Sequence, residues 1–191
     1  MFQIRIHGRG GQGVVTAAEI LSVAAFAEGR HAQAFPSFGS ERTGAPVVSY
    51  CRLDDAEIRT REPVMVPDAL LIQDVTLVHQ VDLFAGLASD GYVLINTSRP
   101  VAELAIDDFL AHFAGTVATC PATEIALEHL GRALPNAALL GGFAALTGQV
   151  GLDALDEAIR ERFAGAVGEK NCAAAHAAYD VVRGGVGARP D

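Results

Sequence analysis

The sequence has few cysteines, and none of them belongs to a close pair. Cys51, Cys120 and Cys172 are the three cysteines of the 191-residue chain, and no CxxC occurs. Zinc and iron–sulfur sites normally include at least one closely spaced cysteine pair, so the chain is predicted to carry neither. An odd, scattered set also differs from the disulfide framework of a small secreted protein.

The chain also lacks a long apolar run, although half of its residues are hydrophobic. No segment approaches the roughly 18 unbroken apolar residues of a membrane-spanning helix. The N-terminus does not have the pattern of a signal peptide, so we expect a cytoplasmic protein without a membrane span. Disordered chains are poor in apolar residues, so the composition predicts a folded chain. Its apolar surplus is expected to pack against a partner subunit.

Basic residues are in the minority. The 14 Lys and Arg residues stand against 23 Asp and Glu, which gives a net charge of −9. A chain of this charge is not expected to bind nucleic acid, because nucleic-acid binding depends on neutralising phosphates. Lys170 is the only lysine, and the planar fork of the many arginines suits carboxylates and phosphates. Individual arginines therefore remain candidates for an anionic ligand.

Catalytic motifs are lacking as well. The sequence contains no P-loop, no HxxxH or HExxH pair, no Ser-His-Asp arrangement and no GDG…NN segment. Cys51 lies in a strand pattern and is interpreted as an inert core thiol. Asp107 and Asp108 are interpreted as a solvated helix end. The sequence thus predicts no catalytic residue and no metal ligand in this chain.

What the sequence does contain is an alternation of strands and helices. Apolar alternation and short apolar runs predict strands at residues 2–7, 31–35, 47–52, 69–73, 92–96 and 116–120. Residues 56–60 are a further candidate, as the second strand of an antiparallel hairpin that turns at Asp54 and Asp55. Helical spacing predicts helices at residues 14–28, 75–85, 124–130, 137–146, 152–163 and 167–183.

This order of elements predicts the class of fold. Strands that alternate with helices indicate an α/β domain with a Rossmann-like, mostly parallel sheet and flanking helices. The last third of the chain is predicted to be helical. We expect a single domain over residues 1–184, with residues 185–191 as a tail.

The first strand is followed by the glycine-rich turn Gly8-Arg9-Gly10-Gly11-Gln12-Gly13, which matches G-x-G-x-x-G in a strand-to-helix context. Glycines allow the backbone to approach an anion, and the N-terminus of the following helix offers unpaired N–H groups. A dinucleotide site normally has an acid at the end of the second strand, where this chain has Ala34-Phe35-Pro36. The turn therefore indicates a phosphate-binding site without the nicotinamide signature. A tight connection without a ligand would favour the same glycines.

The loop from Pro36 to Pro46 is predicted to lie at the same edge of the sheet as the glycine turn. Arg9 and Arg42 would then converge on one anionic ligand. Hydrogen bonds to that ligand are expected from Ser37, Ser40 and Thr43. An ordinary solvated ion pair between Glu41 and Arg42 explains the loop equally well.

In these two loops the chain resembles the gamma subunits of 2-oxoacid:acceptor oxidoreductases. That family acts on pyruvate, 2-ketoisovalerate, 2-oxoglutarate or aryl-glyoxylates such as phenylglyoxylate, with ferredoxin or NAD as acceptor. The resemblance continues at Pro135-Asn136-Ala137-Ala138-Leu139-Leu140-Gly141, at Glu161-Arg162-Phe163, at Glu169-Lys170-Asn171 and at Tyr179, and so covers essentially the whole chain. Thr43 departs from the family, in which a second arginine is common at this position.

The resemblance implies a division of labour between subunits. Thiamine diphosphate, Mg and [4Fe-4S] clusters are expected on thiamine-binding alpha and beta subunits and on a ferredoxin-like delta subunit. A flavoprotein that reduces NAD is a further expected partner where NAD is the acceptor. The complex would convert a 2-oxoacid to acyl-CoA and CO2, and the gamma subunit would be non-catalytic, contributing coenzyme A binding and subunit packing.

The same resemblance suggests which residues contact coenzyme A or a partner subunit. They are Gly8, Arg9, Gly10, Gly11, Gln12, Gly13, Ser37, Phe38, Ser40, Glu41, Arg42 and Asn136. Asn136 is equally explained as a helix N-cap. Two alternatives stay open: a free-standing NAD(P)-binding protein of the Rossmann type, and a purely structural scaffold subunit.

Overall fold

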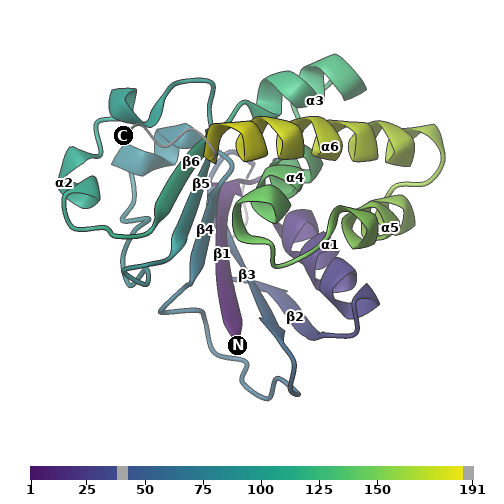
Figure 1. The fold of residues 1–191 in the computed structure, drawn as a ribbon, viewed down its shortest axis with the longest axis horizontal. Helices are drawn as coiled ribbons and strands as arrows, with labels where there is room; N and C mark the ends of the chain where they lie inside the picture. Colours follow the sequence, from purple (N-terminus) through teal and green to yellow (C-terminus); the bar gives the residue numbers. More distant parts are fainter. Residues whose placement is uncertain (38–42, 187–191) are drawn as a thin grey trace.

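The computed structural model describes residues 1–37 and 43–186, which contain one six-stranded sheet in the order β2-β3-β1-β4-β5-β6 (Figure 1). Strands β1, β4, β5 and β6 are parallel, whereas β3 is antiparallel to both of its neighbours. The predicted α/β class with a mostly parallel sheet is confirmed. The strands are β1 (Phe2–Arg9), β2 (His31–Pro36), β3 (Pro46–Asp54), β4 (Ala69–Ile72), β5 (Tyr92–Asn96) and β6 (Thr116–Cys120).

Strand β3 forms its hairpin with β2, so the predicted pairing with residues 56–60 is wrong. Cys51 of β3 faces Ile4 of β1 on one side and Ala34 of β2 on the other. Both edges of β3 are therefore occupied, and no hydrogen-bonding edge is left for residues 56–60. The backbone after β3 is instead held by the buried Arg52, whose guanidinium donates to the carbonyl oxygen of Glu62.

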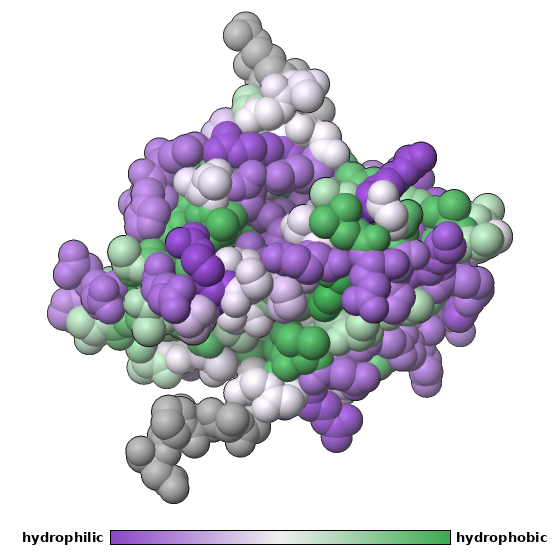
Figure 2. All heavy atoms as spheres, turned by 90° about the horizontal axis from the view of Figure 1, so that it is seen from above, coloured by the Kyte–Doolittle hydropathy of each residue, from purple (hydrophilic) through white to green (hydrophobic). Residues whose placement is uncertain are grey.

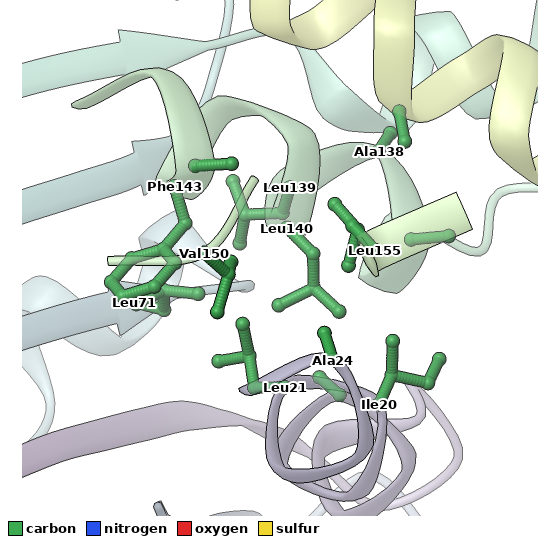
Figure 3. Close-up of a cluster of buried hydrophobic side chains, with 14 of the residues drawn as sticks. Ile20, Leu21, Ala24, Leu71, Ala138, Leu139, Leu140, Phe143, Val150 and Leu155 are labelled. Carbon is green, nitrogen blue, oxygen red and sulfur yellow. The ribbon is translucent and has the colours of Figure 1, made fainter. Parts of the chain in front are cut away.

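The five longer helices lie together on one side of the sheet (Figure 1). Helix α4 contacts both β5 and α6, while α1 contacts β1, β2 and β3. Figure 3 shows Leu21 of α1, Leu71 of β4 and Phe143 of α4 pointing toward one another in this core. Residues 185 and 186, which the sequence places in a tail, belong to the last helix. The helices are α1 (Val14–Ala27), α3 (Ala122–Leu130), α4 (Asn136–Thr147), α5 (Leu152–Arg162) and α6 (Ala166–Val186).

Short segments cover the other face of β4, β5 and β6. They are the 3₁₀ helices η1 (Val75–His79) and η2 (Val101–Glu103) and the helix α2 (Asp107–Leu110). The predicted helix over residues 75–85 is wrong, because only its first five residues are helical. The carbonyl oxygens of Leu83 and Ala85 accept hydrogen bonds from the Arg5 guanidinium at 2.6 and 2.8 Å, which draws this segment onto the sheet.

Candidate functional site

The glycine turn joins β1 to α1 through a sharply bent backbone. Gly13 adopts the left-handed conformation, with φ at 75°, and immediately precedes the first residue of α1. A Cβ atom at this position would lie 2.7 Å from the side-chain nitrogen of Asn136. Any other residue would therefore strain the backbone and collide with α4. The Gln12 side chain closes the turn by accepting a hydrogen bond from the Arg9 backbone N–H at 2.7 Å.

A cavity of about 540 Å³ opens beside this turn. Three segments that are distant in the sequence form it: the glycine turn with the start of α1, the α3–α4 connection, and the start of α6 with the end of α5. Its wall combines apolar, amide and basic groups. The lining residues are Gly11, Gly13, Thr16, Leu130, Arg132, Leu134, Asn136, Phe163, Val167, Lys170 and Asn171.

The charged side chains that line this cavity are basic. Arg132 and Lys170 line it, and no acidic residue of the described ranges 1–37 and 43–186 does. Within residues 1–37 and 43–186, neither of these cations takes part in an ion pair. The N-terminus of α1, which carries partial positive charge, adds to the same potential. The cavity is therefore suited to an anionic ligand.

Asn136 places a largely buried amide in the wall of the cavity. It is only 6% exposed, and its amide has no hydrogen-bond partner within the described part of the chain. The residue is the first of α4, and the N-cap position belongs to Pro135, so the N-cap explanation is wrong. Because this amide lines the cavity, it can both donate and accept hydrogen bonds with a bound ligand. Asn171, also buried, donates its amide N–H to the Val167 carbonyl at 2.8 Å and keeps its side-chain oxygen for an acceptor role.

Arg9 is engaged differently from Arg132 and Lys170. Its guanidinium donates to Asp74 Oδ2 at 3.1 Å, to Gly44 O at 3.1 Å, to Thr76 Oγ1 at 2.8 Å and to Gln80 Oε1 at 2.7 Å. Burial opposes the charge of Asp74, but hydrogen bonds and the nearby guanidinium outweigh it and lower the pKa of this carboxyl. Arg9 thus ties the glycine turn to the hairpin and to η1 through most of its N–H groups.

The hairpin between β2 and β3 reaches the glycine turn, as the sequence predicts. Gly10 donates to the Ala45 carbonyl at 2.9 Å and accepts from the Gly44 N–H at 3.1 Å. Ser37 is exposed, and its N–H donates to the Val48 carbonyl. The remaining predicted residues of this loop, Phe38, Ser40, Glu41 and Arg42, lie outside the described residues. The convergence of Arg9 and Arg42 on one anion therefore stays a prediction.

A second, more open cavity of about 290 Å³ lies against the same turn. It shares Gly11, Gly13 and Thr16 with the larger cavity. The rest of its wall comprises Arg9, Gly10, Val14, Val15 and Val47.

Four residues of the larger cavity were not predicted as site residues: Thr16, Arg132, Lys170 and Asn171. Lys170 and Asn171 could have been predicted from the sequence, because Lys170 is the only lysine and both residues lie in one of the blocks that resemble the gamma subunits. Arg132 belongs to no motif, and its position depends on how the α3–α4 connection folds back over the turn.

The three cysteines do not line either cavity. Cys51, Cys120 and Cys172 are all free and buried. Burial raises the pKa of the Cys51 and Cys120 thiols to about 12, which confirms Cys51 as an inert core thiol. The described residues contain no cluster of three or more metal-ligating side chains. None of their helices is long and apolar enough to cross a membrane.

The fold and the site define a Rossmann-like α/β protein with a glycine turn beside a basic cavity, and comparison with known proteins identifies its family. The model of the pyruvate ferredoxin/flavodoxin oxidoreductase family matches residues 3–181. The chain belongs to this family, and within it to the gamma subunits of pyruvate or 2-oxoacid ferredoxin oxidoreductase complexes.

Individual relatives extend over nearly the whole chain. The pyruvate synthase subunit PorC of Methanothermobacter thermautotrophicus is 48% identical, with 95% of this chain and 96% of the relative covered. The common gamma subunit of the pyruvate/ketoisovalerate oxidoreductases of Thermococcus kodakarensis is also 48% identical, over 94% and 96%. The crystal structure of PORC from Thermotoga maritima is 35% identical, with a TM-score of 0.81 and 94% and 95% covered.

A more distant structure shares the fold alone. The 2-oxoglutarate:ferredoxin oxidoreductase of Magnetococcus marinus, solved with 2-oxoglutarate, coenzyme A and succinyl-CoA bound, matches at a TM-score of 0.73 and 14% identity. The match covers 96% of this chain and 31% of that larger one.

Proposed function

We propose that this gamma subunit binds coenzyme A in the larger cavity beside the glycine turn. The observation that carries the proposal is Asn136, a largely buried residue in the wall of a cavity that Arg132 and Lys170 also line. Within residues 1–37 and 43–186, the Asn136 amide has no hydrogen-bond partner and the two cations have no ion-pair partner. Coenzyme A offers what this wall requires: phosphates for the cations and the α1 N-terminus, and polar base and ribose groups for the amides. The apolar part of the wall, with Leu130 and Phe163, suits the adenine ring.

In this proposal the chain itself performs no bond-making step. Its residues hold and orient coenzyme A, whose thiol accepts the acyl group formed from the 2-oxoacid. Thiamine diphosphate, Mg and the [4Fe-4S] clusters are assigned to partner subunits. The three cysteines of this chain support that assignment, because they are buried in the core and far apart in sequence.

Exposed apolar side chains support packing against partner subunits. Figure 2 looks onto the end of the molecule where α3 and α6 lie and shows several separate apolar patches among hydrophilic side chains. Leu127 of α3 and Val181 of α6 are 49% and 45% exposed. Apolar surface of this kind is often covered in an assembly.

The alternative of an NAD(P)-binding protein is disfavoured by the strand order. A dinucleotide site uses an acid on the parallel strand next to β1, which binds the ribose. Here the neighbour of β1 on that side is the antiparallel β3, and its residue beside the glycine turn is Pro46. The chain therefore presents no ribose-binding carboxylate at the position that such a site uses.

Calorimetric titration of coenzyme A into the assembled complex tests the proposal. Asn136→Ala should weaken binding about tenfold, which corresponds to the loss of one hydrogen bond in a buried site. Arg61→Ala removes an exposed cation on a distant loop and should leave the affinity unchanged.

Each outcome of this titration is informative. Unchanged coenzyme A affinity in the Asn136 variant, with the melting temperature retained, would favour the scaffold alternative. Binding of NADH in place of coenzyme A would favour the dinucleotide alternative.

A further inference from the structure

Strand β2 forms one edge of the sheet (Figure 1). It pairs with β3 on one side, and no described strand pairs with its other side. Helix α1 packs over the face of β2 that carries Ala32 and Ala34. At the opposite edge of the sheet, β6 is additionally contacted by η2. The outer edge of β2 is therefore the candidate surface for pairing with another polypeptide.

The register with β3 determines which backbone groups of β2 are free. The Ser37 N–H donates to the Val48 carbonyl oxygen at 2.9 Å. Antiparallel neighbours bond through alternate residues, so Gln33 also bonds to β3, whereas Ala32 and Ala34 direct their N–H and C=O groups away from it. These outward groups have no hydrogen-bond partner within residues 1–37 and 43–186.

The residues of β2 do not protect this edge. Natural sheets commonly protect an open edge with lysine or other charged side chains. The strand has the sequence His-Ala-Gln-Ala-Phe-Pro, without Lys, Arg, Asp or Glu. Pro36 lies at an outward position, where its missing N–H costs no bond to β3. An open edge without charge, in a chain of net charge −9, indicates a strand that is paired in the working protein.

Helix α1 supplies a second observation at the same edge. Phe26, in its last turn, is 75% exposed, more than any other large apolar side chain in the described ranges. Side chains four residues apart share one side of a helix, so Phe26 lies on the side of Ser22. Ile20 instead points toward Leu155 of α5 (Figure 3). Phe26 thus offers apolar surface away from α5, directly before the chain enters β2.

From these observations we propose that β2 pairs with β2 of a second copy of this chain. The two strands run antiparallel about a two-fold axis at Gln33, so that Ala32 of each copy lies opposite Ala34 of the other. Every outward N–H and C=O of these alanines then gains a partner, and the two sheets join into one. Phe26 of each copy lies on the helix side of this joined sheet and loses exposure there.

Other registers use the edge less well. With Ala34 on the axis, Ala32 would face Pro36, which has no N–H to donate. With Ala32 on the axis, Ala34 would face Arg30, whose N–H already donates to the Ala25 carbonyl oxygen at 3.0 Å. The axis at Gln33 is therefore the register that satisfies all of the outward groups.

A second copy suits this edge better than an unrelated strand for two reasons. The outward donors and acceptors are complementary to themselves under a two-fold rotation, as an isologous interface requires. Like charges opposite each other destabilise paired strands, and β2 carries no acid although the chain is acidic overall. Two copies can thus meet along β2 without electrostatic repulsion between the strands.

Sedimentation of the full chain is the first test. The chain should form a dimer, and Ala34→Pro should raise the dimer dissociation constant at least about tenfold, because it removes an outward N–H from each copy. Ala34→Ser keeps that N–H and should change the constant less than about threefold. Both variants should keep the melting temperature, since no bond to β3 uses the Ala34 N–H.

A disulfide cross-link tests the register. Gln33→Cys places a thiol on the proposed axis, where Cα atoms of opposite residues lie about 4.5 Å apart, within the span of a disulfide. His31→Cys is the matched control, because it lies on the same face of β2 but opposite Phe35 of the second copy. The native cysteines are all buried. Under mild oxidation, Gln33→Cys should give at least about tenfold more covalent dimer than His31→Cys.

Three results would overturn the proposal. One is a full chain that sediments as a monomer at about 100 μM. Another is equal cross-linking of the two cysteine variants, which would reflect random collision. The third concerns the assembled complex, where Gln33→Cys should again join two gamma subunits; protection of this thiol by a different subunit would show that a foreign segment occupies the edge. Coenzyme A affinity enters none of these measurements, so they fail or succeed independently of the proposed binding function.

Discussion

The two faces of the sheet are built from alternate residues of the same strands, yet they are stabilised differently. On the helix-covered face, Ile4, Ile6 and Leu71 are fully buried among apolar neighbours. On the opposite face of β1 and β3, Arg5 and Arg52 are also buried, at 9% and 2% exposure. Over β1 and β3, one face therefore depends on close packing of apolar surface and the other on the pairing of polar groups, whereas the same outer face of β4 and β5 is covered by a second apolar cluster.

The polar face is held by specific hydrogen bonds. Arg52 donates to the side-chain oxygens of Gln3 and Gln33 at 3.1 and 3.2 Å, and its guanidinium lies 5.2 Å from the Phe35 ring centroid. The Arg5 Nε donates to the His7 ring nitrogen at 3.2 Å. Burial, reinforced by the charge of Arg5, lowers the pKa of His7 to about 3. Over β1 and β3, stability is therefore sensitive to side-chain volume on the helix-covered face and to hydrogen-bonding capacity on the opposite face.

The largest effect is expected on the helix-covered face, from Gly141→Ala. A Cβ atom at Gly141 would overlap the backbone carbonyl of Ala175, where α4 and α6 cross. The helices would have to separate, at an expected cost of about 3 kcal/mol in the free energy of unfolding. Gly184→Ala in α6, where a Cβ atom meets nothing, is the matched control and should be neutral or slightly stabilising. Urea denaturation of the two purified variants measures the difference, and equal stabilities would contradict the close α4–α6 contact.

The second-largest loss of stability is expected on the polar face of β1 and β3. Arg52→Met keeps the apolar stem but removes the donors to Gln3, Gln33 and the Glu62 carbonyl. Leaving three part-buried acceptors without donors should lower the free energy of unfolding by about 2 kcal/mol in total. The exposed Arg61→Met should change stability by less than about 0.5 kcal/mol. If both variants have the same urea midpoint, the hydrogen bonds of the polar face contribute nothing.

The smallest effect near neutral pH is a pH dependence from His7, which grows as the pH falls. Its pKa in the folded chain is lowered to about 3, whereas an unfolded histidine titrates near 6.5. Below about pH 6.5 the unfolded state therefore binds the extra proton, and stability should fall by up to about 1.4 kcal/mol per pH unit down to about pH 3. His7→Gln retains an acceptor for Arg5 and cannot titrate, so its stability should decline less steeply between pH 6 and pH 4. Parallel pH profiles for the two proteins would refute this assignment.

Much of the fold follows from local sequence patterns. The predicted strands over residues 92–96 and 116–120 are confirmed residue for residue, because each is a short apolar or β-branched run with clear turn signals on both sides. The predicted helix over residues 14–28 agrees with α1 to within one residue. The glycine turn lies between β1 and α1 as expected. These features depend on neighbouring residues alone, so the sequence contains what is needed to place them.

Other features depend on residues that are far apart in the chain. Arg5 determines the path of residues 83–85, and that contact overrides the helical spacing of residues 75–85. Likewise, β2 occupies the edge of β3 that a strand at residues 56–60 would need. The wall of the larger cavity brings Arg132 and Lys170 to the glycine turn from sites more than a hundred residues away in sequence, and no local pattern marks Arg132 as its neighbour.

The absence of cysteine pairs and of long apolar runs, with the scarcity of basic residues, predicted a protein without a metal centre, a membrane span or a nucleic-acid site. The glycine turn and the blocks that resemble the gamma subunits indicated its family. Those properties are local, because they depend on residue type and short spacing. The tertiary structure decided which cations are available to an anionic ligand. Arg9 is held by Asp74 and the hairpin, while Arg132 and Lys170, beside the buried Asn136, have no ion-pair partner among the residues that the structure describes. The reason is physical, since a charge is available to a ligand only when no protein group nearby already satisfies it.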